Sequence, residues 1–386
     1  MKRLIVLLIA IALIVPAAHG ATKVKIGFIN TITGPEAPIG EYLSNGVTLA
    51  IEDLKKQGIE VDLIREDDTG KPDKSMAAFE KLATRDNVAG IVGPYPSKCA
   101  SAISRLADKY KTPLIIPVAS KEDITKQGLQ WTYRLSATTE DYATILLSMA
   151  AILGPKDKTV AIINENTDFG TSGAKSAKEY ASKHGLTVVA EEAYAPGSPD
   201  YRSTLASIKS KKPDLVFMVS YVADAILLMR QSREIGLAPH AFLGAGAGFA
   251  TSQFQKETDI SNNVFSSTQW TKDVNWPGAA DFYTRYAARF GKEPQYHAAT
   301  AYESMIIMAQ TAAKAKGNRD SIKDQLKRGK WNGIMGEVKF IDYSGYTNQN
   351  HHQMLVEQIG GGKPETVWPP AFAKGKPKYP FPGWSK

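Results

Sequence analysis

Apolar and polar positions follow two different rhythms along the chain. Short runs rich in Val, Ile and Leu, several of them apolar at almost every position, are separated by longer stretches whose apolar residues recur at helical spacing. Nearly continuous apolar runs are expected for strands of a sheet that is covered on both faces. Strand–helix alternation of this kind predicts a parallel sheet wound by right-handed crossovers.

Two such series follow one another. In the first, the predicted strands are 24–29, 61–66, 89–93 and 113–120, and the predicted helices are 41–57, 72–86 and 98–110. In the second, after the segment 131–138, the predicted strands are 159–164, 186–194, 214–220 and 241–246, and the predicted helices are 141–153, 171–184 and 201–211. The predicted fold class is therefore α/β, with two similar doubly wound parallel-sheet lobes.

The pattern changes from about Thr271 onward. Three further helices are predicted at 278–290, 297–316 and 320–329, and a hairpin-like strand pair at 336–342 and 352–360. The tail, 363–386, is rich in Pro and Lys and lacks periodicity, so we expect it to lie along the surface. A simple tandem of two lobes does not require these three helices. Their return to the first lobe therefore stays an open alternative.

The first twenty residues have the pattern of a secretory signal peptide. Two cations at 2–3 precede an apolar stretch at 4–15, and a small-residue segment at 18–20 predicts cleavage after Gly20. A membrane anchor would need about 20 apolar residues. No cysteine stands near the cleavage site to carry a lipid. We therefore expect export and a mature protein that is free in the periplasm.

Composition narrows the function classes further. The chain has 386 residues, which at roughly 150 residues per domain agrees with two domains. The single cysteine, Cys99, excludes an internal disulfide and is expected to be buried. The formal net charge of +8 comes from scattered lysines and not from a basic face with interleaved aromatics. We therefore expect the charge to serve solubility, and no nucleic-acid partner.

Motifs for enzyme chemistry are missing from the sequence. There is no GxxxxGK(S/T) phosphate loop, HExxH zinc motif, GxSxG elbow or cysteine pair. The run GAGAG at 244–248 lacks the third glycine of a dinucleotide site, and we interpret it as a tight turn that passes close to a ligand. His351 and His352 fall in a predicted turn and strand, where a solvent-facing side chain is more common than a metal ligand. The prediction is a protein that is not an enzyme, with no catalytic residue, no metal and no cofactor.

Loops at the carboxyl ends of the predicted strands are the best candidates for a binding site. They span 93–101, 118–122, 164–172 and 220–224. In open α/β sheets such loops converge on the ligand crevice, and the helix that follows offers free N–H groups to an anion. Ser97, Ser120 and the amides of Lys98 and Cys99 thus form a candidate carboxylate cradle. The alternative for each serine is an ordinary helix N-cap.

At these loops the chain resembles the leucine/isoleucine/valine-binding family of periplasmic receptors. The segments that carry the resemblance occur in the same order over nearly all the mature chain: 24–41, 67–75, 93–120, 166–175, 199–221 and 297–305. The resemblance implies a solute-binding subunit of an ABC importer, a monomer that delivers its ligand to a membrane permease. It also implies two lobes joined by three crossovers, with the ligand in the cleft and closure of the lobes upon binding.

The resemblance assigns the lobes and the site residues. The first lobe is expected at 21–139 plus 270–342, with the late helices returning to it, and the second at 140–269 plus 343–386. Ser97 matches the serine that binds the ligand carboxylate, and Val118 and Ser120 match positions that line the same subsite. The residues that match the apolar walls of the pocket are Phe169, Tyr221, Tyr302 and Ile39. The alternative for these aromatics is ordinary core packing.

Gly246 departs from the family pattern. In amino-acid receptors of the family this position holds the acidic residue that binds the ligand's ammonium. The prediction is therefore a small carboxylate-bearing ligand with two alternatives: a hydrophobic amino acid, with a neighbouring acid such as Asp168, Asp224 or Glu303 in the missing role, or an aromatic or branched aliphatic monocarboxylate. An alternative of another class is a sensory ectodomain, which would need a membrane segment or effector domain that the pattern does not predict.

Overall fold

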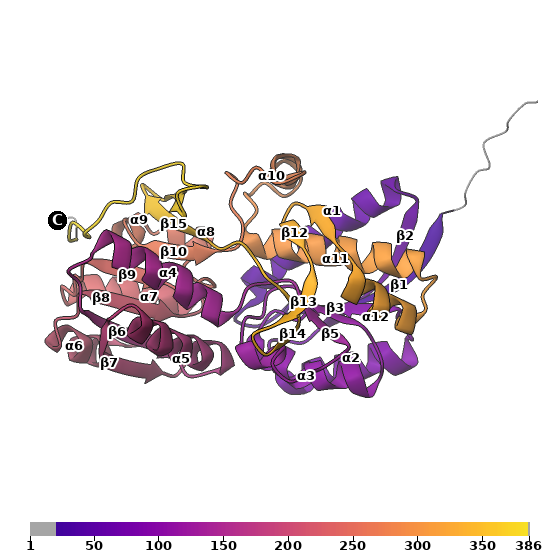
Figure 1. The fold of residues 1–386 in the computed structure, drawn as a ribbon, viewed down its shortest axis with the longest axis horizontal. Helices are drawn as coiled ribbons and strands as arrows, with labels where there is room; N and C mark the ends of the chain where they lie inside the picture. The colour runs from indigo at the N-terminus through magenta and orange to yellow at the C-terminus, as the bar shows by residue number, and fades with distance from the viewer. Residues whose placement is uncertain (1–20, 385–386) are drawn as a thin grey trace, which may run out of the picture.

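The computed structural model of the protein describes residues 21–384, which form two lobes, each built around a seven-stranded sheet (Figure 1). The indigo and purple N-terminal part lies with the orange part in one lobe, whereas the magenta, salmon and yellow parts form the other (Figure 1). The predicted signal peptide, 1–20, lies outside the described residues. None of the helices within 21–384 is long and apolar enough to cross a membrane.

The first lobe holds the early strands and the late helices. Its strands, in spatial order, are β13 (Phe340–Tyr343), β14 (Tyr346–Asn350), β5 (Thr132–Arg134), β4 (Leu114–Ile116), β3 (Gly90–Val92), β1 (Thr22–Asn30) and β2 (Ile59–Asp67). Its helices are α1 (Ala37–Lys56), α2 (Pro72–Glu80), α3 (Ser97–Lys109), α10 (Ala279–Phe290), α11 (Tyr296–Lys314) and α12 (Arg319–Arg328), with a π-helical turn (Lys81–Arg85) and a 3-10 turn (Glu122–Ile124). A small ribbon of β11 (Trp331–Gly333) and β12 (Gly336–Val338) follows α12. Adjacent strands from β14 to β2 run parallel, and β13 is antiparallel to β14.

The second lobe repeats this architecture. Its strands, in spatial order, are β16 (Lys363–Trp368), β15 (Leu355–Gly360), β10 (Phe265–Thr268), β9 (Ala241–Gly244), β8 (Leu215–Val219), β6 (Thr159–Glu165) and β7 (Thr187–Tyr194). Its helices are α4 (Thr139–Leu153), α5 (Asp168–Lys183), α6 (Arg202–Ser210), α7 (Val222–Glu234), α8 (Ser252–Gln255) and α9 (Thr258–Ser261). The strands β6 to β10 run parallel, whereas β15 and β16 pair antiparallel at the edge.

The central strands are apolar along their length because helices cover both faces of each sheet. Every residue of β3, β4 and β8 is buried. In the first lobe, α1 and α11 share a core with one face of the sheet, and α2 and α3 share a second core with the other face. This layering is the physical reason for the near-continuous apolar runs in the sequence.

The late helix α11 returns to the first lobe and packs closely on α1. A Cβ atom on Gly46 of α1 would lie 2.2 Å from the carbonyl oxygen of Ala298 on α11, so only glycine permits this approach. The chain crosses between the lobes three times, between β5 and α4, between β10 and α10, and between β14 and β15 (Figure 1). The two doubly wound lobes and the three-crossover connection predicted above are confirmed.

The predicted hairpin of 336–342 with 352–360 is wrong. The strand β13 pairs with β14 in the first sheet, and β15 pairs with β16 in the second sheet. The segment 343–350, which we expected in the second lobe, therefore belongs to the first.

The reason for this difference is the polar sequence of β14, which is typical of a loop. Its side-chain amides are buried and donate to backbone carbonyls near β5: Asn348 to Thr132 at 3.3 Å, Gln349 to Ser136 at 2.8 Å and Asn350 to Leu135 at 3.0 Å. These bonds satisfy the side-chain N–H groups inside the protein, so a polar segment forms a buried strand.

The tail lies mostly along the surface, as predicted, but parts of it are structured. Its first part forms β16, and the rings of Phe381 and Trp384 pack on Phe242 with centroid distances of 5.4 and 5.5 Å. The tail therefore covers part of the core of the second lobe.

Candidate functional site

A small cavity lies where the strand-end loops of the two lobes meet. Its lining residues are Tyr95, Ser97, Val118, Ala119, Ser120, Phe169, Tyr221, Ala247 and Tyr296. The loops after β3 and β4 of the first lobe and after β6, β8 and β9 of the second supply these residues, together with the first turn of α11. The cavity measures about 10 Å³, room for about one water molecule. The two lobes are therefore closed on one another, and their side chains fill the cleft.

One corner of the cavity carries hydroxyl and amide groups from the first lobe. The hydroxyl oxygen of Ser97 accepts the backbone N–H groups of Ser120 (3.2 Å) and Lys121 (3.3 Å), and the Ser120 hydroxyl donates to the carbonyl of Val118 (3.0 Å). Ser97 begins α3, where the N-cap is Pro96 and not Ser97. The N–H groups of Cys99 (3.1 Å) and Ala100 (3.0 Å) donate to the carbonyl of Pro96, so only the first-turn amides before Cys99 are free of helical bonds; such groups, with the helix dipole, favour an anion. This corner can hold a carboxylate.

The rest of the wall is aromatic and comes from both lobes. The ring of Tyr95 in the first lobe meets that of Tyr221 in the second edge-on at a centroid distance of 5.9 Å, and Phe169 lies 5.4 Å from Tyr221. Burial raises the pKa of the Tyr95, Tyr221 and Tyr296 hydroxyls well above the ordinary value. These groups are therefore neutral hydrogen-bonding groups at physiological pH.

Tyr142 on α4 explains why a glycine stands at position 246. The φ angle of Gly246 is +55°, and a Cβ there would lie 3.0 Å from the ring of Tyr142. The hydroxyls of Tyr142 and Ser120 lie 3.1 Å apart across the lobes, and the Tyr142 hydroxyl accepts from the side-chain amide of Gln269 (2.6 Å). The tyrosine ring thus lies directly against the backbone from which the acidic side chain would project.

The three acids considered as substitutes are engaged elsewhere. Asp168 forms an ion pair with Lys121 at 2.9 Å. Asp224 accepts the hydroxyl of Tyr201 (2.8 Å) inside the second lobe. Glu303 is 3% exposed beside the β11–β12 ribbon, and its burial raises its pKa to about 7. None of these three residues lines the cavity.

Two of the predicted wall residues lie away from the cavity. The Tyr302 hydroxyl donates to Asp53 (2.8 Å), and its ring packs on Phe282 at 5.0 Å in the core of the first lobe. Ile39 is 2% exposed in the same core. Both side chains follow the alternative of core packing that their sequence left open.

The predicted residues Ser97, Val118, Ser120, Phe169 and Tyr221 come together around the cavity, and Gly246 adjoins its lining residue Ala247. Residues that the sequence did not single out complete the site: Tyr95, Ala119, Tyr142, Ala247 and Tyr296. Tyr95 belongs to the 93–101 loop that was predicted to bind, so its place in that loop was an available signal. Tyr142 and Tyr296 lie on helices, where a buried tyrosine is indistinguishable from core packing.

Direct contacts join the rims of the two lobes. On one side, Lys121 pairs with Asp168, and Glu122 accepts the hydroxyl of Ser176. On the other side, the hydroxyls of Tyr42 and Ser252 lie 3.0 Å apart. These contacts exist only while the lobes are closed.

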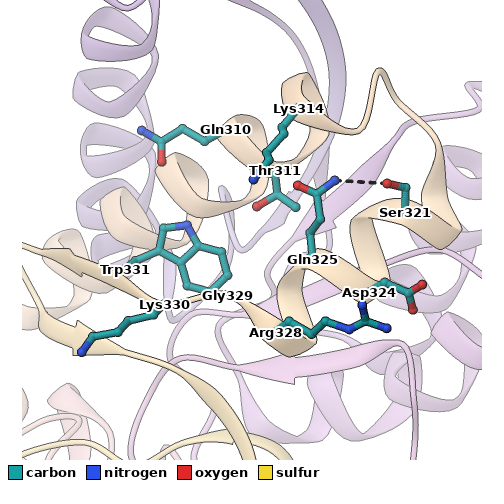
Figure 2. A pocket seen from close by; sticks show the side chains of 10 residues that line it. All are labelled: Gln310, Thr311, Lys314, Ser321, Asp324, Gln325, Arg328, Gly329, Lys330 and Trp331. Carbon is teal, nitrogen blue, oxygen red and sulfur yellow. Dashed lines mark hydrogen bonds between the residues drawn. The ribbon is translucent and has the colours of Figure 1, made fainter.

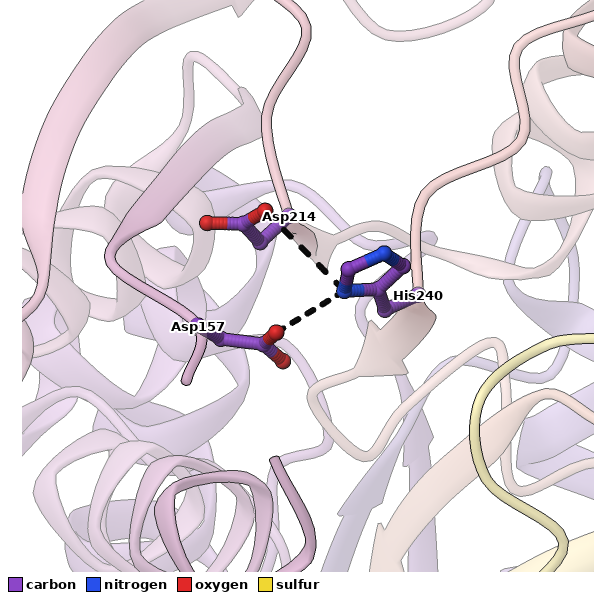
Figure 3. Close-up of side chains that lie close together, drawn as sticks. All are labelled: Asp157, Asp214 and His240. Carbon is purple, nitrogen blue, oxygen red and sulfur yellow. Dashed lines mark hydrogen bonds and ion pairs between the residues drawn. The ribbon is translucent and has the colours of Figure 1, made fainter. Parts of the chain in front are cut away.

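The side chains of Asp157, Asp214 and His240 gather at the amino ends of β6, β8 and β9 (Figure 3). Their ligand atoms lie within 4.8 Å of one another, but hydrogen bonds already engage them. The Nδ1 atom of His240 lies 2.8 Å from the Asp157 carboxylate, and Asp214 accepts the N–H groups of Lys158 (2.8 Å) and Thr159 (2.9 Å). The cluster therefore has a structural explanation at the strand starts.

The expectation of solvent-facing histidines is wrong for His352. Its side chain is 5% exposed, and its Nε2 atom lies 2.6 Å from the carbonyl oxygen of Gln269. Burial lowers its pKa to about 4.

A larger groove of about 750 Å³ lies between α11, α12 and β11 (Figure 2). Its lining includes Lys314, Arg328 and Trp331, and all its residues belong to the first lobe. Movement of one lobe against the other therefore cannot close this groove around a molecule, in contrast to the cleft.

Comparison with known proteins identifies relatives over almost the whole chain. The family described as periplasmic binding protein matches residues 23–363. The Leu/Ile/Val-binding protein homolog 7 of Brucella melitensis biotype 1 is 29% identical, over 98% of this chain and 99% of the relative.

Solved structures share the fold at lower identity. The branched-chain amino acid transporter substrate-binding protein LivJ from Streptococcus pneumoniae, in complex with isoleucine, aligns with a TM-score of 0.79 and 24% identity, covering 90% of this chain and 100% of that one. A solute-binding protein of an ABC transporter from Rhodopseudomonas palustris, in complex with 3,4-dihydroxybenzoic acid, aligns with a TM-score of 0.78 and 23% identity, covering 87% of this chain and 93% of that one.

Proposed function

The chain belongs to the periplasmic binding protein family, and from this premise we propose that it is the solute-binding subunit of an ABC importer that closes its two lobes around a small carboxylate-bearing ligand. The observation that carries the proposal is the cleft cavity, because residues of both lobes line it and its polar corner suits a carboxylate. A ligand that touches both lobes stabilises the closed state over the open one. The closed form is then the one presented to a membrane permease.

An aromatic or branched aliphatic monocarboxylate is the ligand class that the cleft supports best. Burial of an ammonium without a carboxylate partner costs several kcal/mol. The position that would supply the partner is Gly246, and Tyr142 lies against it. Phe169, Tyr221 and Tyr95 offer aromatic walls for an apolar body. The 3,4-dihydroxybenzoic acid in the Rhodopseudomonas palustris protein agrees with this class.

A hydrophobic amino acid is the second candidate. Burial is the main cause of the raised pKa of Tyr95. The negative charge of Glu36 is the second cause, and the charge of Glu165 raises this pKa as well. Two acids therefore lie within electrostatic range of the cleft, although Glu165 already accepts the N–H group of Gly170 at 2.6 Å. The isoleucine in LivJ agrees with this candidate.

A thermal-shift panel distinguishes the two candidates. Each amino acid is paired with its deaminated analogue: leucine with 4-methylpentanoate, isoleucine with 3-methylpentanoate and phenylalanine with 3-phenylpropanoate, with benzoate as a further acid. A ligand that binds the native state and not the unfolded state raises the melting temperature, by more the further its concentration exceeds the Kd. We expect the acids to stabilise the protein and the amino acids to leave it unchanged. Strong stabilisation by an amino acid alone would replace the first candidate by the second, and turnover of a bound compound would contradict a binding protein.

The cellular setting follows from the same premise. A cleavable signal peptide at 1–20 would deliver the protein to the periplasm as a free monomer, without a lipid anchor or nucleic-acid partner. Mass spectrometry of the mature protein from the periplasmic fraction tests this, with Ala21 expected as the first residue.

A further inference from the structure

Two polar side chains beside the cleft have no hydrogen-bond partner among residues 21–384. The hydroxyl of Tyr95 and both ring nitrogens of His297 are buried and unpaired, and the two residues are 3% and 0% exposed. An unpaired buried polar group carries a desolvation penalty that a bound partner would remove. A phenylalanine would fill either position without that penalty.

The two side chains are neighbours, and His297 lies behind two residues that line the cavity. Tyr95 lines it, and the ring of His297 stands edge-on to that of Tyr95 at a centroid distance of 5.6 Å. His297 also stacks on Tyr296, another lining residue, at 3.9 Å. Both Tyr95 and His297 are on the first lobe, the lobe that also supplies the carboxylate corner around Ser97.

The chemistry of this pair restricts the group that can satisfy it. Burial lowers the pKa of His297 to about 3, so its imidazole is neutral, with one donor and one acceptor nitrogen. A tyrosine hydroxyl both donates and accepts. A carbonyl oxygen can only accept, whereas a hydroxyl group can donate to the acceptor nitrogen of His297 and at the same time accept from the tyrosine, which leaves only the imidazole N–H to be satisfied.

We propose that Tyr95 and His297 bind a hydroxyl group on the body of the ligand, so that the solute is a hydroxylated monocarboxylate. The inference rests on the proposed function, because it places this hydroxyl on the ligand that the cleft encloses. The polar corner around Ser97 then binds the carboxylate that all the acids share. The Tyr95–His297 pair distinguishes hydroxylated acids from acids without a hydroxyl group.

Isothermal titration with matched acids tests the inference. The probes are benzoate with its three monohydroxy derivatives, and 3-phenylpropanoate with 3-(4-hydroxyphenyl)propanoate. We expect at least one hydroxylated acid to bind the wild type roughly tenfold or more tightly than its parent acid, the ratio expected for one well-formed hydrogen bond to a buried group. Both His297→Phe and Tyr95→Phe should reduce this ratio to near one.

The variants are chosen so that a folding defect is separable from lost recognition. Tyr95→Phe removes one oxygen atom that has no partner in the protein. Tyr286→Phe is the matched control, a buried tyrosine of the same lobe whose hydroxyl lies 3.4 Å from Asn45, and it should keep the wild-type ratio. Equal binding of hydroxylated and parent acids by the wild type, or an unchanged ratio in both phenylalanine variants, would overturn the inference alone. Failure of every acid and every amino acid to bind would overturn the proposed function and this inference together.

Discussion

At the scale of single residues, position relative to a strand end decides which predicted side chains meet in the cleft. Ser97, Val118, Phe169 and Tyr221 all follow a parallel strand closely, and all line the cavity. The carboxyl ends of parallel strands meet at one edge of a sheet. A strand assignment from the sequence is therefore enough to predict that residues just after these strands lie close together. Their contact with a ligand stays a prediction.

Residues on helices could not be assigned in the same way. Tyr302 and Ile39 point into the core of the first lobe, whereas Tyr142 and Tyr296 reach the cleft. The direction of a helical side chain depends on which face of the helix packs inward, and that is set by tertiary contacts that no local pattern contains. The unpaired state of His297 is likewise visible only once its surroundings are known.

The role of Ser97 leads to a prediction about binding. The Ser97→Ala variant should weaken binding of the cognate acid by about 1–3 kcal/mol, the range for the loss of a hydrogen bond to a charged or buried group. The variant also releases the N–H groups of Ser120 and Lys121 that shape the corner. Isothermal titration measures the change.

The control for Ser97→Ala is Ser101→Ala on the same helix. The Ser101 hydroxyl has no hydrogen-bond partner in the part of the chain that the structure describes, so its removal should leave the affinity unchanged. If Ser97→Ala and Ser101→Ala both bind like the wild type, the carboxylate does not sit at this corner.

At the scale of elements, apolar periodicity located most helices and most central strands, but it missed α7 (Val222–Glu234) and β10 (Phe265–Thr268) and failed at β14. The predicted helix 278–290 is α10 (Ala279–Phe290), and the predicted helix 320–329 is α12 (Arg319–Arg328). These helices bury an apolar stripe, which the sequence records directly. The strand β14, which lies between the edge strand β13 and β5, buries amides instead, so its sequence carries no apolar strand signal.

The contact between α1 and α11 leads to a prediction about stability. The Gly46→Ala change would gain about 1 kcal/mol of helix propensity. The new methyl group would stand 2.2 Å from the Ala298 carbonyl oxygen, which forces the two helices apart. Overpacking of this kind costs about 1–3 kcal/mol, and more where backbone must move. We therefore expect a net loss in the free energy of unfolding, measured by denaturant titration.

An open glycine provides the comparison for Gly46→Ala. No atom lies within 4 Å of a Cβ placed on Gly360 at the end of β15, so Gly360→Ala should change stability little. A Gly46→Ala protein as stable as the wild type would mean that α11 can shift away from α1 at little cost.

At the scale of the whole molecule, the contacts between the lobes are individually weak. Lys121 and Asp168 form an ion pair at 2.9 Å, with side chains 23% and 35% exposed. Such partly exposed pairs contribute about 0–1 kcal/mol. The other direct contacts, such as the Tyr42–Ser252 hydroxyl pair, are single hydrogen bonds that water can replace in an open form. Without a ligand, the closed state is therefore stabilised directly by little more than the aromatic contacts in the cleft.

This balance predicts that the ligand-free protein opens in solution and that the ligand closes it. Small-angle scattering should show a smaller radius of gyration with saturating ligand than without it, at an unchanged molecular mass. The starting protein must first be freed of retained solute, checked by mass spectrometry of the small molecules it releases.

The Asp168→Asn variant should bind less tightly by at most about 1 kcal/mol, because it removes only the rim ion pair. Glu179→Gln, which breaks the Lys183–Glu179 pair on the same helix α5, should leave the affinity unchanged because that pair does not join the lobes.

A radius of gyration that stays constant when a verified ligand-free protein is saturated would contradict hinge closure, since every contact at the rim would then persist without the ligand.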